Sequence, residues 1–172
     1  MSKKKEIKKV PKKEKELIGA TELVDFPELG WQQVPARVDT GAATSSIHCS
    51  RVRLVEKAGQ PKRLSFYLDV QKGAPRQPFS VTDFEETTIK NSFGHEERRY
   101  VIKTQIVLGK RRIRTEFSLA DRRKMSYPVL LGRKLLKGRF LVDVSQKYLA
   151  SSAARRSLAA DAPDSSTSST TT

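Results

Sequence analysis

Two short segments of this sequence combine residue types that could carry out acid–base chemistry. Residues 39–41 read Asp-Thr-Gly directly after the apolar residue Val38, so a carboxylate is presented where a strand is expected to end. About ninety residues later, residues 130–132 read Leu-Leu-Gly. Asp and Gly are common turn residues, so the first segment alone is compatible with an ordinary turn, and the second alone with an apolar strand. Their occurrence together favours a carboxylate that takes part in a reaction.

Metal-assisted and nucleophilic mechanisms need residues that this sequence barely supplies. Zinc requires three or four converging ligands, and the nitrogen and sulfur candidates are His48, Cys49 and His95. The first two are adjacent, so on a strand they point to opposite faces. We therefore expect no metal site, although a site made only of carboxylates stays open. A lone cysteine is typically a small buried hydrophobe, and Ser45 and Ser46 lie in no G-x-S-x-G motif, so we do not expect a nucleophilic mechanism.

Positive charge is the strongest compositional feature of the chain. Its 172 residues contain 34 Lys and Arg against 19 Asp and Glu, a formal net charge of +15. Residues 1–15 contribute +6 and residues 151–172 contribute none, so residues 16–150 retain +9. We expect a disordered basic arm over residues 1–15, one domain with its own core over residues 16–150, and a disordered Ser/Thr-rich tail over residues 151–172.

A basic domain should attract an acidic partner: nucleic acid, an acidic peptide or an anionic lipid. The sequence shows no membrane-spanning run and no signal peptide, and it contains a single cysteine, so a reducing, cytoplasmic setting is expected. Weak RNA or ribosome association through residues 1–15 is an alternative. Aromatic residues make up only 7% of the chain and no RRM, KH or zinc-knuckle motif occurs, so the sequence has no specific reader of RNA.

Short runs of strand-forming residues dominate the expected domain. The clearest hairpin flanks Gly109-Lys110, where glycine in the first position of a two-residue loop is typical of a type II′ turn. A helix of one or two turns is expected after residue 132. The pattern predicts an all-β barrel or sandwich with one short helix near its C-terminal end. The expected strands lie within residues 34–39, 45–57, 63–70, 99–108, 111–120, 127–131 and 139–149.

The two opening segments together resemble the retropepsin-like aspartic proteases, whose single-lobed subunits carry Asp-Thr/Ser-Gly early and a hydrophobic-hydrophobic-Gly motif late. The similarity extends through residues 37–48 (RVDTGAATSSIH), the hairpin around Gly109 and residues 125–144 (MSYPVLLGRKLLKGRFLVDV), and covers about residues 17–149. It is greatest for a bacterial branch often labelled "ATP-dependent zinc protease", which is associated with the ligase that adds glutamates to a ribosomal protein. The chain has neither a zinc ligand set nor a G-x-x-x-x-G-K-[ST] loop to support that label.

The resemblance implies a closed, single-lobed barrel that is active as a two-fold homodimer. Two carboxylates about 3 Å apart share a proton and act as general base and general acid on a peptide bond. The chain has one Asp-Thr-Gly, so the second carboxylate must come from a second subunit. The resemblance makes Asp39 the catalytic carboxylate, has Thr40 bond across to the partner loop, and has Gly41 allow close approach of backbone and substrate. The strand implied to thread behind this loop contains Leu130, Leu131 and Gly132.

The residues expected around the site predict an acidic substrate. Viral relatives place acidic residues after Asp-Thr-Gly-Ala, whereas Ala43 and Thr44 stand there in this chain, and arginine can bind carboxylates in a bidentate manner. A solvated surface charge is the simpler interpretation of any single arginine, and Arg133 alternatively has a structural role with Asp143 or Glu116 as its partner. The expected substrate-binding residues are Ala42, Thr44, Arg98, Arg99, Arg122 and Arg133.

The family covers its site with a β-hairpin flap, which is expected within residues 61–99, with Gly73 or Gly94 at its tip. The sequence therefore predicts an aspartic endopeptidase that acts without a cofactor on acidic, poly-glutamate-modified peptide segments. A catalytically silent relative that binds acidic tails and an RNA- or ribosome-associated β domain are the alternatives.

Overall fold

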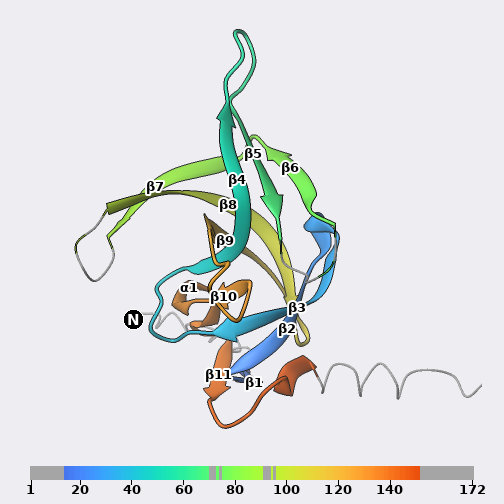
Figure 1. Cartoon of the computed structure of the whole chain (residues 1–172). Coiled ribbons are helices and arrows are strands. Elements are labelled where there is room, and N and C mark those ends of the chain that lie inside the picture. The colour runs from blue at the N-terminus through green and yellow to red at the C-terminus, as the bar shows by residue number, and fades with distance from the viewer. Residues whose placement is uncertain (1–13, 70–72, 74, 91–93, 95, 152–172) are drawn as a thin grey trace, which may run out of the picture.

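The computed structural model describes residues 14–69, 73, 75–90, 94 and 96–151 (Figure 1). The expected basic arm and Ser/Thr-rich tail therefore lie almost entirely outside the described residues. Eleven strands and two short helices make up the described part of the chain. In chain order they are β1 (Glu16–Gly19), β2 (Thr21–Phe26), η1 (Pro27–Leu29), β3 (Trp31–Val38), β4 (Ser45–Val55), β5 (Arg63–Leu68), β6 (Gln77–Val81), β7 (Phe84–Lys90), β8 (Glu96–Leu108), β9 (Arg111–Ala120), β10 (Val129–Leu131), α1 (Arg133–Leu136) and β11 (Phe140–Asp143).

Six of the strands form a closed barrel, which confirms the predicted fold class. Around the ring the order is β10, β3, β2, β8, β9 and β4, and β4 pairs with β10 to close it. Strands β5 and β6 continue outward from β4, and β7 pairs with β8. Strands β1 and β11 form a separate two-stranded parallel sheet below the barrel in the view of Figure 1. Closure leaves the ring without unpaired edges.

The hairpin of β8 and β9 has the predicted turn. Gly109 has a φ of 58°, and Lys110 is not among the residues with positive φ, which is the combination that a type II′ turn requires. The register runs in step from Leu108 opposite Arg111 to Val101 opposite Ser118. These two strands form adjacent parts of the barrel wall, between β2 and β4, and β9 ends at Ala120.

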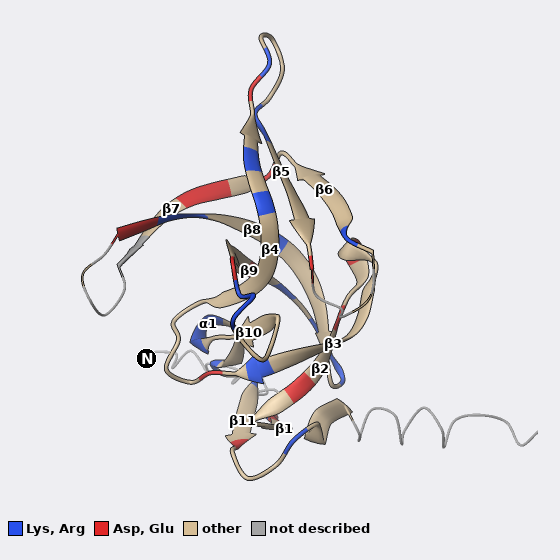
Figure 2. Cartoon of the chain, viewed as in Figure 1, with Lys and Arg blue, Asp and Glu red and all other residues tan. Residues whose placement is uncertain are grey.

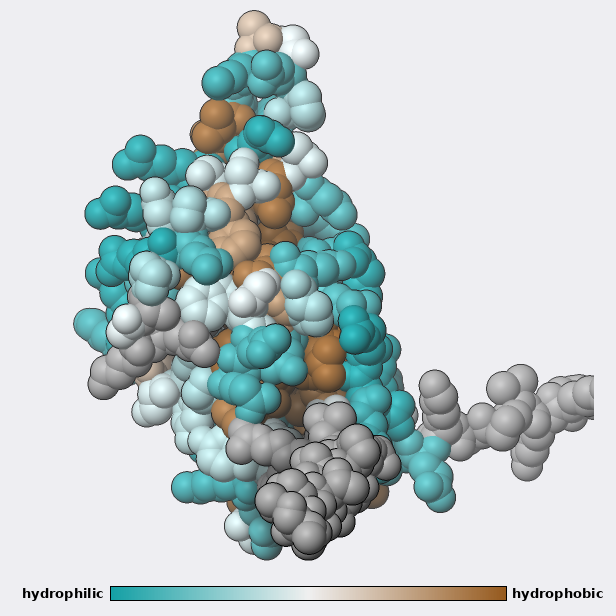
Figure 3. Space-filling view, turned by 90° about the vertical axis from the view of Figure 1, so that its right-hand side faces the viewer, coloured by the Kyte–Doolittle hydropathy of each residue, from teal (hydrophilic) through white to brown (hydrophobic). Residues whose placement is uncertain are grey.

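The core fills the inside of the barrel with aliphatic and aromatic side chains. Phe26 and Phe117 are fully buried and meet edge to face with ring centroids 5.3 Å apart. Around them lie buried residues of the six barrel strands, including Val34, Ile106 and Leu131. The face shown in Figure 3 is largely hydrophilic, with apolar residues confined to a central band. No helix in the described ranges is long and apolar enough to span a membrane.

One carboxylate lies in the core without a cationic partner among the described residues. Glu22 is completely buried and accepts hydrogen bonds from the amides of Gly19 (2.8 Å) and Ala150 (3.0 Å). It also accepts from the amide (3.2 Å) and the hydroxyl (2.7 Å) of Ser151. Charge-assisted bonds of this kind replace the lost hydration of a carboxylate. They fasten the C-terminal end of the described chain to β2, one residue beyond the expected domain boundary.

Candidate active site

The carboxylate of Asp39 is fixed by its own loop at the end of β3. The amide of Asp39 donates to the carbonyl of Leu131 at 3.0 Å. Its Oδ1 accepts from the amides of Gly41 at 2.9 Å and Ala42 at 3.1 Å. Its Oδ2 accepts no hydrogen bond from any described residue, and the side chain is partly exposed. The loop thus orients one carboxylate oxygen and leaves the other available.

Strand β10 passes between β3 and β4, the two strands that the Asp39 loop connects. It runs parallel to β3, with Leu131 beside Val38, and antiparallel to β4, with Leu130 beside Ser46. Glycine is required where β10 ends, because a Cβ on Gly132 would lie 2.4 Å from the carbonyl oxygen of Thr44. The two sequence motifs are therefore in direct contact, as expected for residues 130–132.

Residues at the start of helix α1 donate hydrogen bonds to the remaining residues of the loop. The amide of Arg133 donates to the carbonyl of Ala42 at 2.9 Å, and that of Lys134 to Ala43 at 3.1 Å. The guanidinium of Arg133 donates to the carbonyls of Thr40 at 3.2 Å and Gly41 at 2.5 Å. Arg133 therefore holds the loop on which Asp39 sits.

The partners suggested for Arg133 were wrong. Glu116 pairs with Lys134 at 3.2 Å, and Asp143 accepts from the hydroxyl of Ser145 at 2.6 Å. The reason is that the loop turns two carbonyl oxygens toward the guanidinium, and a carbonyl, like a carboxylate, accepts from the arginine fork.

The outward face of the loop is open. Thr40, Gly41 and Ala43 are exposed, and Ala42 and Thr44 are half-buried. The Thr40 hydroxyl makes no hydrogen bond within the part of the chain that the structure describes. An unpartnered hydroxyl beside a carboxylate is available to a substrate or to another protein chain.

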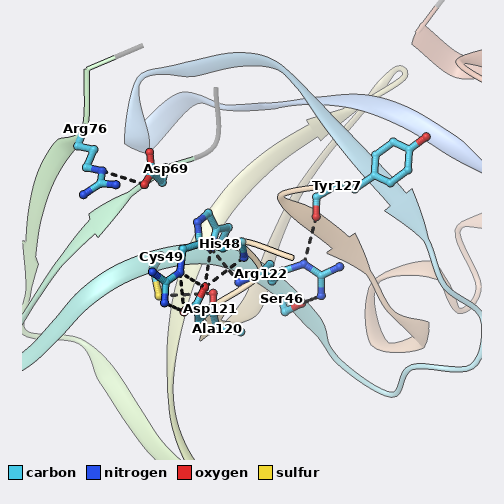
Figure 4. A network of polar contacts seen from close by, with 10 residues as sticks. Ser46, His48, Cys49, Asp69, Arg76, Ala120, Asp121, Arg122 and Tyr127 are labelled. Atoms are coloured by element: carbon cyan, nitrogen blue, oxygen red, sulfur yellow. Dashed lines mark hydrogen bonds and ion pairs between the residues drawn. The ribbon is translucent and has the colours of Figure 1, made fainter. Parts of the chain in front are cut away.

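Arg122 lies between the Asp39 loop and a neighbouring pocket. Its guanidinium donates to Ser46 Oγ at 3.1 Å and to the carbonyl of Tyr127 at 3.2 Å, and its amide donates to His48 Nδ1 at 2.9 Å (Figure 4). Burial lowers the pKa of Arg122, repulsion from Arg99 lowers it further, and attraction to Asp39 raises it. The charge of Arg122 therefore interacts with Asp39 in the loop and with Arg99 in the pocket.

Arg98 and Arg99 line that pocket, which has a volume of about 500 Å³ between β4, β8 and β9. Arg98 pairs with Glu86 at 3.0 Å and Arg99 with Glu97 at 2.7 Å. Figure 2 shows the acidic part of β7 beside the basic part of β8. We call this cavity the basic pocket. The other residues that line it are Cys49, Ser50, Arg51, Val52, Arg76, Glu97, Tyr100, Leu119, Ala120, Asp121 and Arg123.

The model of one protein family, described as "RimB-like: Retropepsin-like aspartic endopeptidase RimB", matches residues 17–153. That range spans most of the chain and includes both motifs of the candidate site.

The chain belongs to the RimB-like family.

Relatives of this family member are described as probable alpha-L-glutamate ligases. One from Shewanella pealeana is 39% identical over 136 residues, which are 77% of this chain and 29% of that protein. One from Desulfotalea psychrophila is 36% identical over 137 residues, which are 75% of this chain and 28% of that protein. The chain therefore spans less than a third of the length of these relatives. A crystal structure of Lpg0085, a protein of unknown function from Legionella pneumophila, matches with a TM-score of 0.63 at 23% identity, covering 78% of this chain and 98% of that one, and shows the fold alone.

The thiol and hydroxyl groups considered as nucleophiles have other roles in this RimB-like chain. Cys49 is 2% exposed; burial raises the pKa of its thiol to about 12, with the charge of Asp121 adding to the effect. A thiol with such a pKa is not ionised at neutral pH. Ser45 Oγ accepts the amide of Gly132 at 3.0 Å, and Ser46 Oγ accepts from Arg122. Within the described ranges neither serine hydroxyl donates to a histidine or a carboxylate.

The described residues bring no three His, Cys, Asp or Glu side chains together in a way that could hold a metal ion. His48 is buried and its Nδ1 is used as an acceptor for the amide of Arg122. His95 lies outside the described residues.

The expected flap region contains two hairpins. Strands β7 and β8 form one, with Phe84 opposite Ile102, and Gly94 lies in its turn with a φ of 81°. Strands β5 and β6 form the other, and Gly73 lies between them with a φ of 84°. In Figure 1 the β7–β8 hairpin projects from the barrel on the side of the loop that follows β3.

Proposed function

We propose that this chain is an aspartic endopeptidase whose active site forms between two copies of the chain. The observation that carries the proposal is the attachment of the Asp39 loop to Leu131 and Arg133, with Oδ2 of Asp39 left without a partner among the described residues. A carboxylate that is oriented by backbone amides and open on its outer side is suited to acid–base catalysis.

The reaction needs two carboxylates. One Asp39 acts as general base and removes a proton from water, which attacks the peptide carbonyl carbon, while the protonated partner donates to the carbonyl oxygen. As the C–N bond breaks, the carboxyl that took a proton from water donates it to the leaving amine, and the ionised partner takes a proton back from a hydroxyl of the tetrahedral intermediate. One chain supplies one such group, so a two-fold dimer places the second Asp39 opposite the first. The free hydroxyl of Thr40 is available to bond across the axis, and the reaction uses no cofactor.

The substrate is an acidic peptide segment, with glutamates added after translation as the most specific candidate. The relatives described as glutamate ligases share this module, which supports an association with glutamate chains. Ala43 and Thr44 add no negative charge beside Asp39, and Arg122, which has no carboxylate partner among the described residues, adds positive charge that acts on Asp39. The setting proposed for this reaction is the cytoplasm.

Replacement of the catalytic carboxylate tests the proposal. We expect Asp39→Asn to abolish hydrolysis of a glutamate-rich peptide while the circular dichroism spectrum and the dimer are retained. Asp83→Asn is the matched control, because Asp83 is exposed between β6 and β7. Turnover by purified Asp39→Asn at more than a few per cent of the wild-type rate excludes the aspartic mechanism.

A comparison of peptides tests the substrate class. We expect kcat/KM to be at least about tenfold higher for a Glu-rich than for a Lys-rich peptide, and to fall as salt screens the basic charge. Equal rates that do not respond to salt would show that the charge serves another partner. Wild-type binding to an RNA oligomer, lost when the eight Lys of residues 1–15 are changed to Gln, would favour the ribosome-associated alternative.

A further inference from the structure

Strand β4 carries a β-bulge at the basic pocket. Its register with β5 shifts between Ser50 and Arg53, and Arg51 has a φ of 52°. Side chains of a regular strand alternate between faces, yet Ser50, Arg51 and Val52 all line the same pocket. A non-glycine residue in left-handed backbone is uncommon, and bulges near functional sites redirect side chains. The bulge therefore turns consecutive residues of β4 toward this pocket.

The pocket also contains an arginine whose charge is not neutralised by a carboxylate within the described ranges. Arg51 instead places its guanidinium 5.9 Å from the centroid of the Tyr67 ring, on the neighbouring strand β5. The other four arginines that line the pocket each pair with an acid. These pairs are Arg76 with Asp69, Arg98 with Glu86, Arg99 with Glu97, and Arg123 with Asp121.

Strand β4 connects the candidate active site to the basic pocket. It begins at Ser45, directly after the Asp39 loop, and its residues 49–52 line the pocket. Arg122 follows Asp121 of the pocket and donates to Ser46 Oγ at 3.1 Å. In Figure 4, His48 and Asp121 lie between Arg122 on one side and the Arg76–Asp69 pair on the other. A peptide that crosses Asp39 and extends along β4 would therefore reach the pocket some residues away from the bond that is cut.

We propose that the basic pocket is a specificity subsite that binds one carboxylate of the substrate at a position remote from the scissile bond. Arg51, whose guanidinium has no carboxylate partner among the described residues, supplies the charged contact. The volume of about 500 Å³ accommodates an acidic side chain and the backbone that carries it. The inference rests on the proposed function for the identity of its ligand. The bulge, and the charge of Arg51 that no described carboxylate neutralises, support it separately.

Binding to a full-length Asp39→Asn protein tests the subsite without requiring hydrolysis. The probe is a fluorescent peptide of six L-glutamates, and the readout is anisotropy. We expect Arg51→Gln to weaken binding about tenfold, because a hydrogen bond to a charged group contributes on the order of 1.5–3 kcal/mol. Arg51→Lys, which keeps the charge, should recover part of the loss. Arg53→Gln is the matched control: Arg53 is an exposed residue of the same strand outside the pocket, and its loss should change affinity by less than about twofold.

The remaining outcomes separate the subsite from the catalytic proposal. Peptides with a single Gln in place of Glu should show that Arg51→Gln removes the preference for Glu at one position only. If wild-type protein fails to hydrolyse peptides but binding still depends on Arg51, the catalytic proposal is wrong and the subsite stands. Two results would overturn the subsite. One is an equal loss of peptide affinity in Arg51→Gln and Arg53→Gln. The other is that Arg51→Gln loses binding to an oligouridylate probe while its affinity for the peptide is unchanged.

Discussion

The backbone amide of Asp39 donates to the carbonyl oxygen of Leu131 at 3.0 Å, although 91 positions separate the two residues in the sequence. This bond joins the two motifs of the candidate site, because it continues the parallel pairing of β3 and β10 up to the acidic residue. The orientation of the carboxylate therefore depends on β10, which forms part of the barrel wall.

Close approach at Gly132 predicts a large structural effect of a single methyl group. Gly132→Ala should lower the free energy of unfolding by about 3 kcal/mol or more, because its Cβ would overlap the carbonyl of Thr44. Gly59→Ala should cost only about 1 kcal/mol, since Gly59 has left-handed backbone but no atom within 4 Å of the added Cβ. Urea unfolding of both variants measures the difference. Similar midpoints for the two would contradict the close packing of residue 132 against the loop.

The contacts of Arg133 predict a kinetic effect that distinguishes positioning from substrate binding. Arg133→Ala should lower kcat at least about tenfold and change KM less than about twofold, because the loop carrying Asp39 loses two hydrogen bonds. Lys134→Ala is the control, since the Lys134 ammonium pairs with Glu116 instead of the loop. A rise in KM with kcat unchanged would return Arg133 to the role of substrate contact that its sequence position suggested.

The barrel and the two motifs could be predicted from sequence because their signals are local. The alternating runs around Gly109, the apolar strand before Gly132 and the single turn of α1 each need only neighbouring residues, and the structure has all three. Strands β1, β2, β6 and β7 were not predicted. For β2 the reason is physical. A glutamate such as Glu22 is usually exposed to solvent, so the sequence does not indicate a buried strand there. Three of the four hydrogen bonds that allow its burial come from residues 150 and 151, which are distant in the sequence.

The basic pocket shows the same limit. Arg98 and Arg99 were predicted to lie around the site and attract an acidic substrate, whereas Arg51 and Arg76 were not considered for it. A left-handed φ at Arg51 gives no signal in the sequence, because it follows from the shifted register of β4 against β5. The acidic partner expected for Arg133 was wrong for a similar reason. Tertiary contacts decide that the loop turns the carbonyls of Thr40 and Gly41 toward its guanidinium, and the sequence does not show this.

The buried thiol predicts a stability change at alkaline pH. The pKa of Cys49 is higher in the folded chain, at about 12, than its ordinary value of 9.0. Its contribution is therefore fully present below about pH 9 and is lost as the pH rises toward 12, because only the unfolded chain can form the thiolate. The loss at pH 10 should be on the order of 1 kcal/mol. Urea midpoints at pH 8 and pH 10 should differ less in Cys49→Ala than in the wild type, and an equal drop in both would show that other groups cause it.

Mixing active and inactive subunits tests the central claim that one active site is built from two Asp39 side chains. Wild-type and Asp39→Asn proteins are combined in different proportions, allowed to exchange subunits, and assayed on a glutamate-rich peptide at constant total protein. If both carboxylates are required, activity follows the square of the wild-type fraction, so an equal mixture keeps about one quarter of the full activity. Activity that falls in direct proportion to the wild-type fraction, to about one half in the equal mixture, would contradict the shared site.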